Sequence, residues 1–194
     1  MLQCTGILLA AGQGKRAGGP KALKLVEGHL WWRCQVEAMR LAVCQVVAVL
    51  HPDAWPDAAV CPDGVQACAG DPVAEQLASL QQAIAIAVQF APKLPVLVLP
   101  VDCPWPGVQV AKLLTSAADD RCTAVRPVVS IDHFLRGGHP LLLTPRSFAP
   151  LLALNERTDR LDRWLALQPK GALLNIETAD RRVLANRNDQ ADWA

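Results

Sequence analysis

The sequence lacks any apolar run approaching the roughly 20 residues that a membrane-spanning helix needs, although 52% of its residues are hydrophobic. It also lacks an excess of charge: 19 basic and 18 acidic side chains give a formal net charge of +1. A balance of this kind excludes the electrostatic signature of nucleic-acid or anionic-membrane binding. The amino-terminal segment MLQCTGILLA has no basic n-region of a signal peptide. These features predict a soluble, cytoplasmic protein that binds neither nucleic acid nor membrane.

The cysteines show no C-x-x-C spacing, which is the usual sign of a zinc or redox site. Most of them lie in apolar segments, where a reduced cysteine behaves as a small hydrophobic side chain. We therefore predict that none of the seven binds zinc: Cys4, Cys34, Cys44, Cys61, Cys68, Cys103 and Cys122.

The 194 residues contain no internal repeat, low-complexity tract or polar linker, which predicts a single domain over 1–194. Short apolar runs alternate with longer amphipathic segments, the pattern of a mostly parallel sheet with crossover helices. We predict strands at 5–10, 45–50, 64–67, 95–101, 123–129, 140–144 and 172–176. We predict helices at 30–42, 73–89, 108–117 and 145–154. The segment SIDHFLRGGHP (130–140) could form a hairpin arm, which would make the sheet mixed.

A glycine-rich loop follows the first predicted strand and contains Gly12, Gly14, Gly18 and Gly19. Loops at the carboxyl ends of strands bind ligands in α/β sheets, and glycines let backbone N–H groups approach phosphate oxygens. The spacing differs from G-x-G-x-x-G, because the third glycine comes one position late and Gly19-Pro20 delays the helix. It also lacks the G-K-[ST] of a Walker A loop. We therefore disfavour both of these nucleotide-binding motifs.

The same loop carries three cations, Lys15, Arg16 and Lys21. Cations of this kind can hold a triphosphate while negative charge moves onto a leaving pyrophosphate. The alternative is a glycine-rich surface turn with solvated basic side chains. The combination of four glycines with three cations favours a phosphate-binding loop.

LAAGQGKRAGGPK (9–21) closely resembles the signature of the MobA-like nucleotidyltransferases, a family that includes molybdenum-cofactor guanylyl- and cytidylyltransferases. VDCP (101–104), GGHP (137–140) and ANRND (185–189) follow in the order of that family, so the resemblance covers nearly the whole chain. It implies a three-layer α/β/α sandwich with a Rossmann-like, mostly parallel mixed sheet, as in nucleotide-diphospho-sugar transferases. It also implies that Arg16 and Lys21 are catalytic, and that the nucleotide and its phosphates contact Leu9, Ala10, Ala11, Gly12, Gly14, Lys15 and Ser79.

The resemblance further implies a Mg²⁺ site. Asp102 follows an apolar strand and matches the metal-binding aspartate, and its carboxylate is a suitable hard ligand. Asn188 aligns with a second ligand, although the segment after it departs from the family pattern and Asp189 is an alternative. Gly138 and His139 match a G-H-P loop near the acceptor site, which favours a pterin acceptor. A molybdoenzyme or another protein of the cofactor pathway is a partner that this reading implies.

Three functions remain open from the sequence. The first is transfer of a nucleotide from an NTP, with CTP favoured, to a small phosphorylated acceptor of the molybdopterin type. The second is a sugar-phosphate nucleotidyltransferase. The third is a non-catalytic nucleotide-binding protein, which would account for the departures from the family pattern at Val101, Cys103 and the last motif. The segment AGDPVAEQLASL (69–80) resembles the loop and helix start that recognise the nucleobase in this family, and its Ser79-Leu80 matches the cytidylyltransferase-like members. Asp71 and Gln76 of this segment could equally be a helix cap and an exposed side chain.

Overall fold

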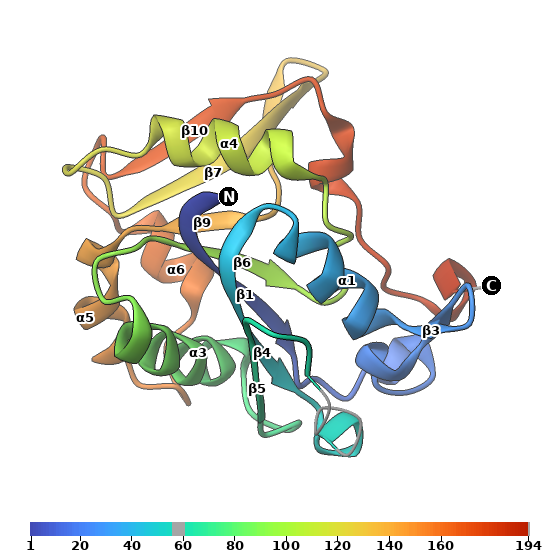
Figure 1. The fold of residues 1–194 in the computed structure, drawn as a ribbon. Coiled ribbons are helices and arrows are strands. Elements are labelled where there is room, and N and C mark those ends of the chain that lie inside the picture. Colours follow the sequence, from blue (N-terminus) through green and yellow to red (C-terminus); the bar gives the residue numbers. More distant parts are fainter. Residues whose placement is uncertain (56–60, 194) are drawn as a thin grey trace.

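The computed structural model describes residues 1–55 and 61–193. Within them, one eight-stranded sheet has the order β10-β7-β9-β6-β1-β4-β5, and β8 pairs with β7 (Figure 1). Six strands run in the same direction: β1 (Leu2–Ala10), β4 (Val43–Leu50), β5 (Val65–Ala69), β6 (Val96–Pro100), β7 (Ala124–Ile131) and β10 (Leu173–Glu177). The other two, β8 (Phe134–Gly137) and β9 (Leu141–Leu143), run antiparallel to their neighbours.

Helices cover both faces of this sheet, so the fold has three α/β/α layers (Figure 1). α1 (Trp31–Arg40) and α4 (Val108–Ala117) pack on one face, and α3 (Gln76–Phe90), α5 (Pro145–Leu152) and α6 (Leu161–Ala166) pack on the other. Strand β1 contributes to both cores, because alternate side chains of a strand point to opposite faces. Leu8 packs with α1 and α4, whereas Ile7 and Leu9 pack with α3.

The predicted α/β/α architecture and the mixed, mostly parallel sheet are confirmed, and 130–140 is indeed a hairpin arm, formed by the end of β7 and by β8. α3 begins at Gln76 rather than at 73, because the Asp71 carboxylate accepts a hydrogen bond from the Val73 amide and holds a turn there. The short helix α6 was not predicted. The paired Trp31 and Trp32 are both buried.

Several short elements connect the core. β2 (Leu25–Val26) and β3 (His29–Leu30) form a two-stranded sheet of their own. The described residues also contain short 3₁₀ helices: η1 (Lys15–Ala17), η2 (Lys21–Leu23), η3 (Pro52–Ala54), η4 (Arg181–Leu184) and η5 (Gln190–Trp193). η1 and η2 lie in the glycine-rich loop, and η5 packs against η1 although they come from opposite ends of the described chain.

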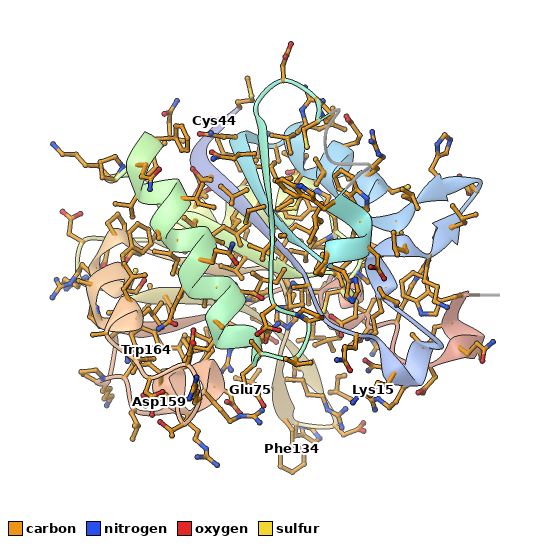
Figure 2. All side chains as sticks on the ribbon, turned by 90° about the horizontal axis from the view of Figure 1, so that it is seen from below. Lys15, Cys44, Glu75, Phe134, Asp159 and Trp164 are labelled. Atoms are coloured by element: carbon orange, nitrogen blue, oxygen red, sulfur yellow. The ribbon has the colours of Figure 1, made fainter. Side chains whose placement is uncertain are left out.

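The carboxyl ends of β1, β6 and β7 meet at one edge of the sheet, since these strands run in the same direction. The ladder continues beyond the strands: the Val101 amide donates to the Leu9 carbonyl at 2.9 Å. The glycine-rich loop after β1 and the turn after β6 are therefore neighbours. Lys15 after β1, Glu75 after β5 and Phe134 after β7 lie along the same rim of the molecule (Figure 2).

Candidate active site

The glycine-rich loop folds back on itself through left-handed backbone. Gly14 and Gly18 have φ of +60° and +73°. The Gly14 carbonyl accepts hydrogen bonds from the amides of Ala17 at 2.9 Å and Gly19 at 3.1 Å. A Cβ on Gly14 would overlap the Gly19 carbonyl oxygen, so only glycine fits there. Ala17 is fully buried and anchors the loop.

A cavity of about 300 Å³ lies between this loop, the start of α3 and the turn after β6. Most of the site residues predicted from the sequence line it, together with side chains of the loop before α3. The lining residues are Leu9, Ala11, Gly12, Gly14, Lys15, Arg16, Lys21, Asp71, Ala74, Gln76, Ser79, Pro100, Val101, Asp102 and Asn188. The fold therefore brings these residues together from four separate segments of the chain.

Lys21, Asp102 and Asn188 meet on the wall of the cavity. The Lys21 ammonium donates to Asp102 Oδ2 at 3.0 Å and to Asn188 Oδ1 at 3.1 Å. The side chains of Lys21 and Asp102 are 13% and 25% exposed, so this ion pair is only partly screened by water. Two oxygen atoms predicted as metal ligands thus converge on a single positive charge.

Helix α1 positions the turn that carries Asp102. The indole N–H of Trp31 donates to the Val101 carbonyl at 2.6 Å, and the buried Gln35 amide donates to the Cys103 carbonyl at 2.7 Å. Burial raises the pKa of the Cys103 thiol, and the neighbouring Asp102 carboxylate raises it further. The protonated thiol lies 3.6 Å from Asp102 Oδ1 as a weak donor. The carboxylate is therefore held on both sides by fixed groups.

A segment near the end of the described chain brings Asn188 to the same place. The Arg187 amide donates to the main-chain carbonyl of Asp102 at 2.7 Å, which ties the two segments together. The Asp192 carboxylate accepts hydrogen bonds from the amides of Asn188 and Asp189 at 2.7 and 2.8 Å. These bonds lower the pKa of Asp192 and keep it ionised. Asp189 is exposed and its side chain is not among the lining residues of the cavity.

Residues 6–173 match the family described as "MobA-like NTP transferase domain". The match covers most of the chain. This protein belongs to the MobA-like NTP transferase family. Membership makes it a nucleotidyltransferase, with an NTP as one substrate and an acceptor as the other. A search of curated proteins found no significant match to the chain.

Several solved structures share this fold. Rv0371c from Mycobacterium tuberculosis H37Rv is 17% identical, with coverage of 99% of this chain and 96% of that one, at a TM-score of 0.77. A nucleotidyl transferase from Methanothermobacter, Mth528, is 20% identical to this chain. The match covers 100% of this chain and 95% of Mth528, with a TM-score of 0.74. The 2-C-methyl-D-erythritol 4-phosphate cytidylyltransferase from Thermus thermophilus is 21% identical. The match covers 97% of this chain and 94% of that enzyme, with a TM-score of 0.65. A second structure of the mycobacterial protein is a complex with manganese.

The loop cations of this MobA-like transferase differ in their surroundings. Lys15 and Arg16 are exposed at the cavity, as expected for groups on an open loop. Lys21 is less exposed, because its ion pair with Asp102 draws it into the wall of the cavity. Ser79 is 7% exposed and lies near the start of α3. The positive end of that helix therefore faces the same space as the cations.

Three predicted site residues do not line the cavity of the transferase. Ala10 points into the core beneath α1. Gly138 packs so closely against the Val183 carbonyl that a Cβ would overlap it, and the His139 amide donates to the same carbonyl at 2.8 Å. Burial lowers the pKa of His139; the Asp102 carboxylate opposes the shift and the Arg126 guanidinium adds to it. His139 therefore lies outside the cavity lining, but near enough to Asp102 for that carboxylate to influence its pKa.

The side chains that hold the predicted ligands in position were not predicted from the sequence. Trp31 and Gln35 lie on α1, and the amphipathic pattern of this helix does not indicate that their side chains donate hydrogen bonds to the turn after β6. Arg187 and Asp192 flank Asn188, but the pattern of the segment does not show their contacts. Asp71, which could have capped α3, instead closes the turn before it.

None of the described helices is both long and apolar enough to span a membrane.

Proposed function

We propose that this chain transfers CMP from CTP to a phosphorylated acceptor of the molybdopterin type and releases pyrophosphate. The observation that carries the proposal is the convergence of the Asp102 and Asn188 oxygens with the Lys21 ammonium beside the glycine-rich loop. A charge arrangement of this kind stabilises the negative charge that develops when pyrophosphate leaves.

The residues present fit a divalent metal. Asp102 and Asn188 supply hard oxygen atoms, and both already surround a cation, the Lys21 ammonium. Within the described ranges, no cluster of three or more His, Cys, Asp and Glu side chains could hold a metal by itself. One carboxylate and one amide oxygen suit Mg²⁺, which binds through one or two protein oxygens together with substrate phosphates. When bound, the metal supplies charge neutralisation at the phosphates.

The chain's own residues do the remaining work in the proposed reaction. The Gly12 to Gly14 backbone and the Lys15 and Arg16 side chains hold the β- and γ-phosphates at the cavity. An acceptor phosphate oxygen attacks the α-phosphorus, the bond from that phosphorus to the bridging oxygen breaks, and pyrophosphate leaves with the electron pair. A phosphate monoester is mostly ionised near neutral pH, so no protein base is required. Positioning and charge are sufficient for catalysis.

CTP is favoured by the match of Ser79-Leu80 to cytidylyltransferase-like sequences and by the place of Ser79 on the cavity wall. A pterin acceptor is favoured by the G-H-P loop at 138–140. A second candidate acceptor, a sugar or polyol phosphate, is favoured by the similarity in fold to the 2-C-methyl-D-erythritol 4-phosphate cytidylyltransferase. Both candidate acceptors would react with the same nucleotide donor and release the same pyrophosphate.

The test is pyrophosphate release with Mg²⁺, in which CTP, GTP, UTP and ATP are combined with molybdenum cofactor, its metal-free pterin precursor and a panel of sugar and polyol phosphates. We expect release with CTP and a pterin. Release only with a sugar or polyol phosphate would replace the acceptor by the second candidate, and release only with GTP would replace the nucleotide. NTP binding without release on any acceptor would contradict the proposal.

A further inference from the structure

Arg187 contacts two tryptophan rings next to the proposed metal ligands. Its guanidinium carbon is 4.5 Å from the centre of the Trp31 ring and 5.4 Å from the centre of the Trp193 ring. The two rings meet edge to face, with centres 5.7 Å apart and an interplanar angle of 83°. Cation–π contacts at these distances are attractive and hold the planar guanidinium in one orientation. Residue 187 is thereby fixed immediately before Asn188.

The same Trp31 ring also fixes the other ligand. Its N–H donates to the Val101 carbonyl at 2.6 Å, immediately before Asp102, while its face carries Arg187. Trp31, the first residue of α1, is only 6% exposed and packs in the core cluster on that face of the sheet. One rigid, buried ring therefore contacts both segments that carry the ligands, and its position sets how closely Asp102 and Asn188 approach.

The segment that carries Asn188 gains little order from secondary structure. Among the described residues, 185–189 lie outside the sheet and the helices, and only the short turn η5 follows them. Trp193, in η5, packs against the core, but its Nε1 is buried without a hydrogen-bond partner in the described part of the chain. The placement of this ring is therefore not explained by its own polar group. It is explained by the contacts it makes with Trp31 and Arg187.

We infer that Trp31, Arg187 and Trp193 form a clamp that positions Asn188 for binding of the divalent metal. The inference rests on the proposed function, because it takes Asp102 and Asn188 as the ligands. Arg187 and Trp193 are positioning residues: they act through Asn188 and the Asp102 carbonyl. Outer groups that orient metal ligands typically change metal affinity by about 10- to 100-fold when they are removed.

The experiment measures the dissociation constant of Mn²⁺, used alone as a spectroscopic probe, by the loss of the free-ion signal in electron paramagnetic resonance. The test variants are Arg187→Met, which keeps the length of the side chain, and Trp193→Ala, with Trp193→Phe as the rescue variant. Arg33→Met is the matched control, because Arg33 stacks on Trp32 at 5.0 Å and lies outside the segment that carries Asn188. The midpoint of thermal unfolding is recorded for each.

We expect Arg187→Met and Trp193→Ala to weaken Mn²⁺ binding about 10- to 100-fold, and Trp193→Phe and Arg33→Met to retain it. Arg187→Met should change the midpoint of thermal unfolding no more than Arg33→Met does, since both are partly buried guanidinium groups that lie over a tryptophan ring. Unchanged Mn²⁺ affinity in Arg187→Met and Trp193→Ala would overturn the clamp. An equal loss in Arg33→Met would also overturn it.

Asp102→Ala and Asn188→Ala separate this inference from the proposed function. If both lose Mn²⁺ binding while Arg187→Met keeps it, only the clamp is wrong. If both bind Mn²⁺ as tightly as the unaltered protein, the metal assignment itself is wrong, and the clamp fails with it.

Discussion

Lys21 and Asp102, which are 81 residues apart in the sequence, form an ion pair of 3.0 Å on the wall of the cavity. The pair joins the glycine-rich loop after β1 to the turn after β6, so it couples the proposed phosphate site to the proposed metal site. The Lys21 ammonium also contacts Asn188. The Lys21 ammonium thus links three of the segments that build the site.

Replacing Lys21 tests this link. We expect Lys21→Ala to lower kcat by about 10²- to 10³-fold, the typical effect of removing one group that stabilises transition-state charge. The free energy of unfolding should also fall, by about 1 to 3 kcal/mol, because the partly buried Asp102 carboxylate loses its partner. Lys112→Ala, on an exposed part of α4, is the control and should change neither. Pyrophosphate release by Lys21→Ala at the normal rate would contradict a catalytic role.

Substitutions at two glycines of the loop distinguish the role of backbone geometry from the role of contact with the ligand. Gly14→Ala should destabilise the loop and abolish NTP binding, because residue 14 has positive φ and its Cβ would overlap Gly19. Gly12→Ala meets no atom within 4 Å and should leave the free energy of unfolding unchanged within about 0.5 kcal/mol. Its methyl group would nevertheless project at the cavity wall. We expect it to raise KM for the NTP by about tenfold, equivalent to about 1.4 kcal/mol.

Steady-state kinetics and thermal unfolding of these two variants check the prediction. Tight NTP binding by Gly14→Ala would show that the folded-back loop is not required. An unchanged KM in Gly12→Ala would show that the phosphates do not approach the backbone at that point.

His139 should make stability depend on pH. Burial lowers its pKa in the folded protein, so the unfolded chain binds more protons near the ordinary histidine pKa of about 6.5. The stabilisation from the neutral ring is fully present above that pH and is lost as pH falls below it, with a slope of up to about 1.4 kcal/mol per pH unit. His139→Gln should flatten this slope, whereas His29→Gln, an exposed histidine, should not. Denaturant unfolding at several pH values between 5 and 8 measures this pH dependence of the free energy of unfolding. Equal slopes in His139→Gln and the unaltered protein would contradict the lowered pKa of His139.

The proposed in-line displacement has a stereochemical consequence. A single attack by the acceptor on the α-phosphorus inverts its configuration, whereas a covalent nucleotidyl-enzyme intermediate, formed and then broken, retains it. With a chiral α-thio-CTP as donor, we expect inversion in the product, read out by ³¹P NMR. Retention would show that a side chain of the protein acts as a nucleophile.

The sheet and the larger helices could be predicted because their apolar patterns are long and regular. In α3, Leu80 and Ile84 recur on one face and are fully buried. α6 was missed because it is short and its side chains are at most half-buried. The start of α3 was placed too early because the turn at Asp71 depends on a hydrogen bond that propensity does not show.

The site was predictable to the extent that its residues stand in contiguous motifs. The glycine-rich loop carries its own geometric requirement, as Gly14 demonstrates, and Asp102 follows an apolar strand. The contacts of Trp31 and Arg187 could not be predicted, since they join residues far apart in the sequence and depend on ring orientation. The same limit applies to the partial burial of Lys21, which depends on a partner 81 residues away.

The most direct test of the account is Mg²⁺-dependent pyrophosphate release from CTP with a phosphorylated pterin acceptor, measured side by side for the unaltered protein and for Asp102→Ala. We predict release that requires both Mg²⁺ and the acceptor, and a loss of at least about 10²-fold in Asp102→Ala. Release that persists in Asp102→Ala at the same rate and with the same Mg²⁺ dependence would contradict the central claim that Asp102 organises the charge at this site.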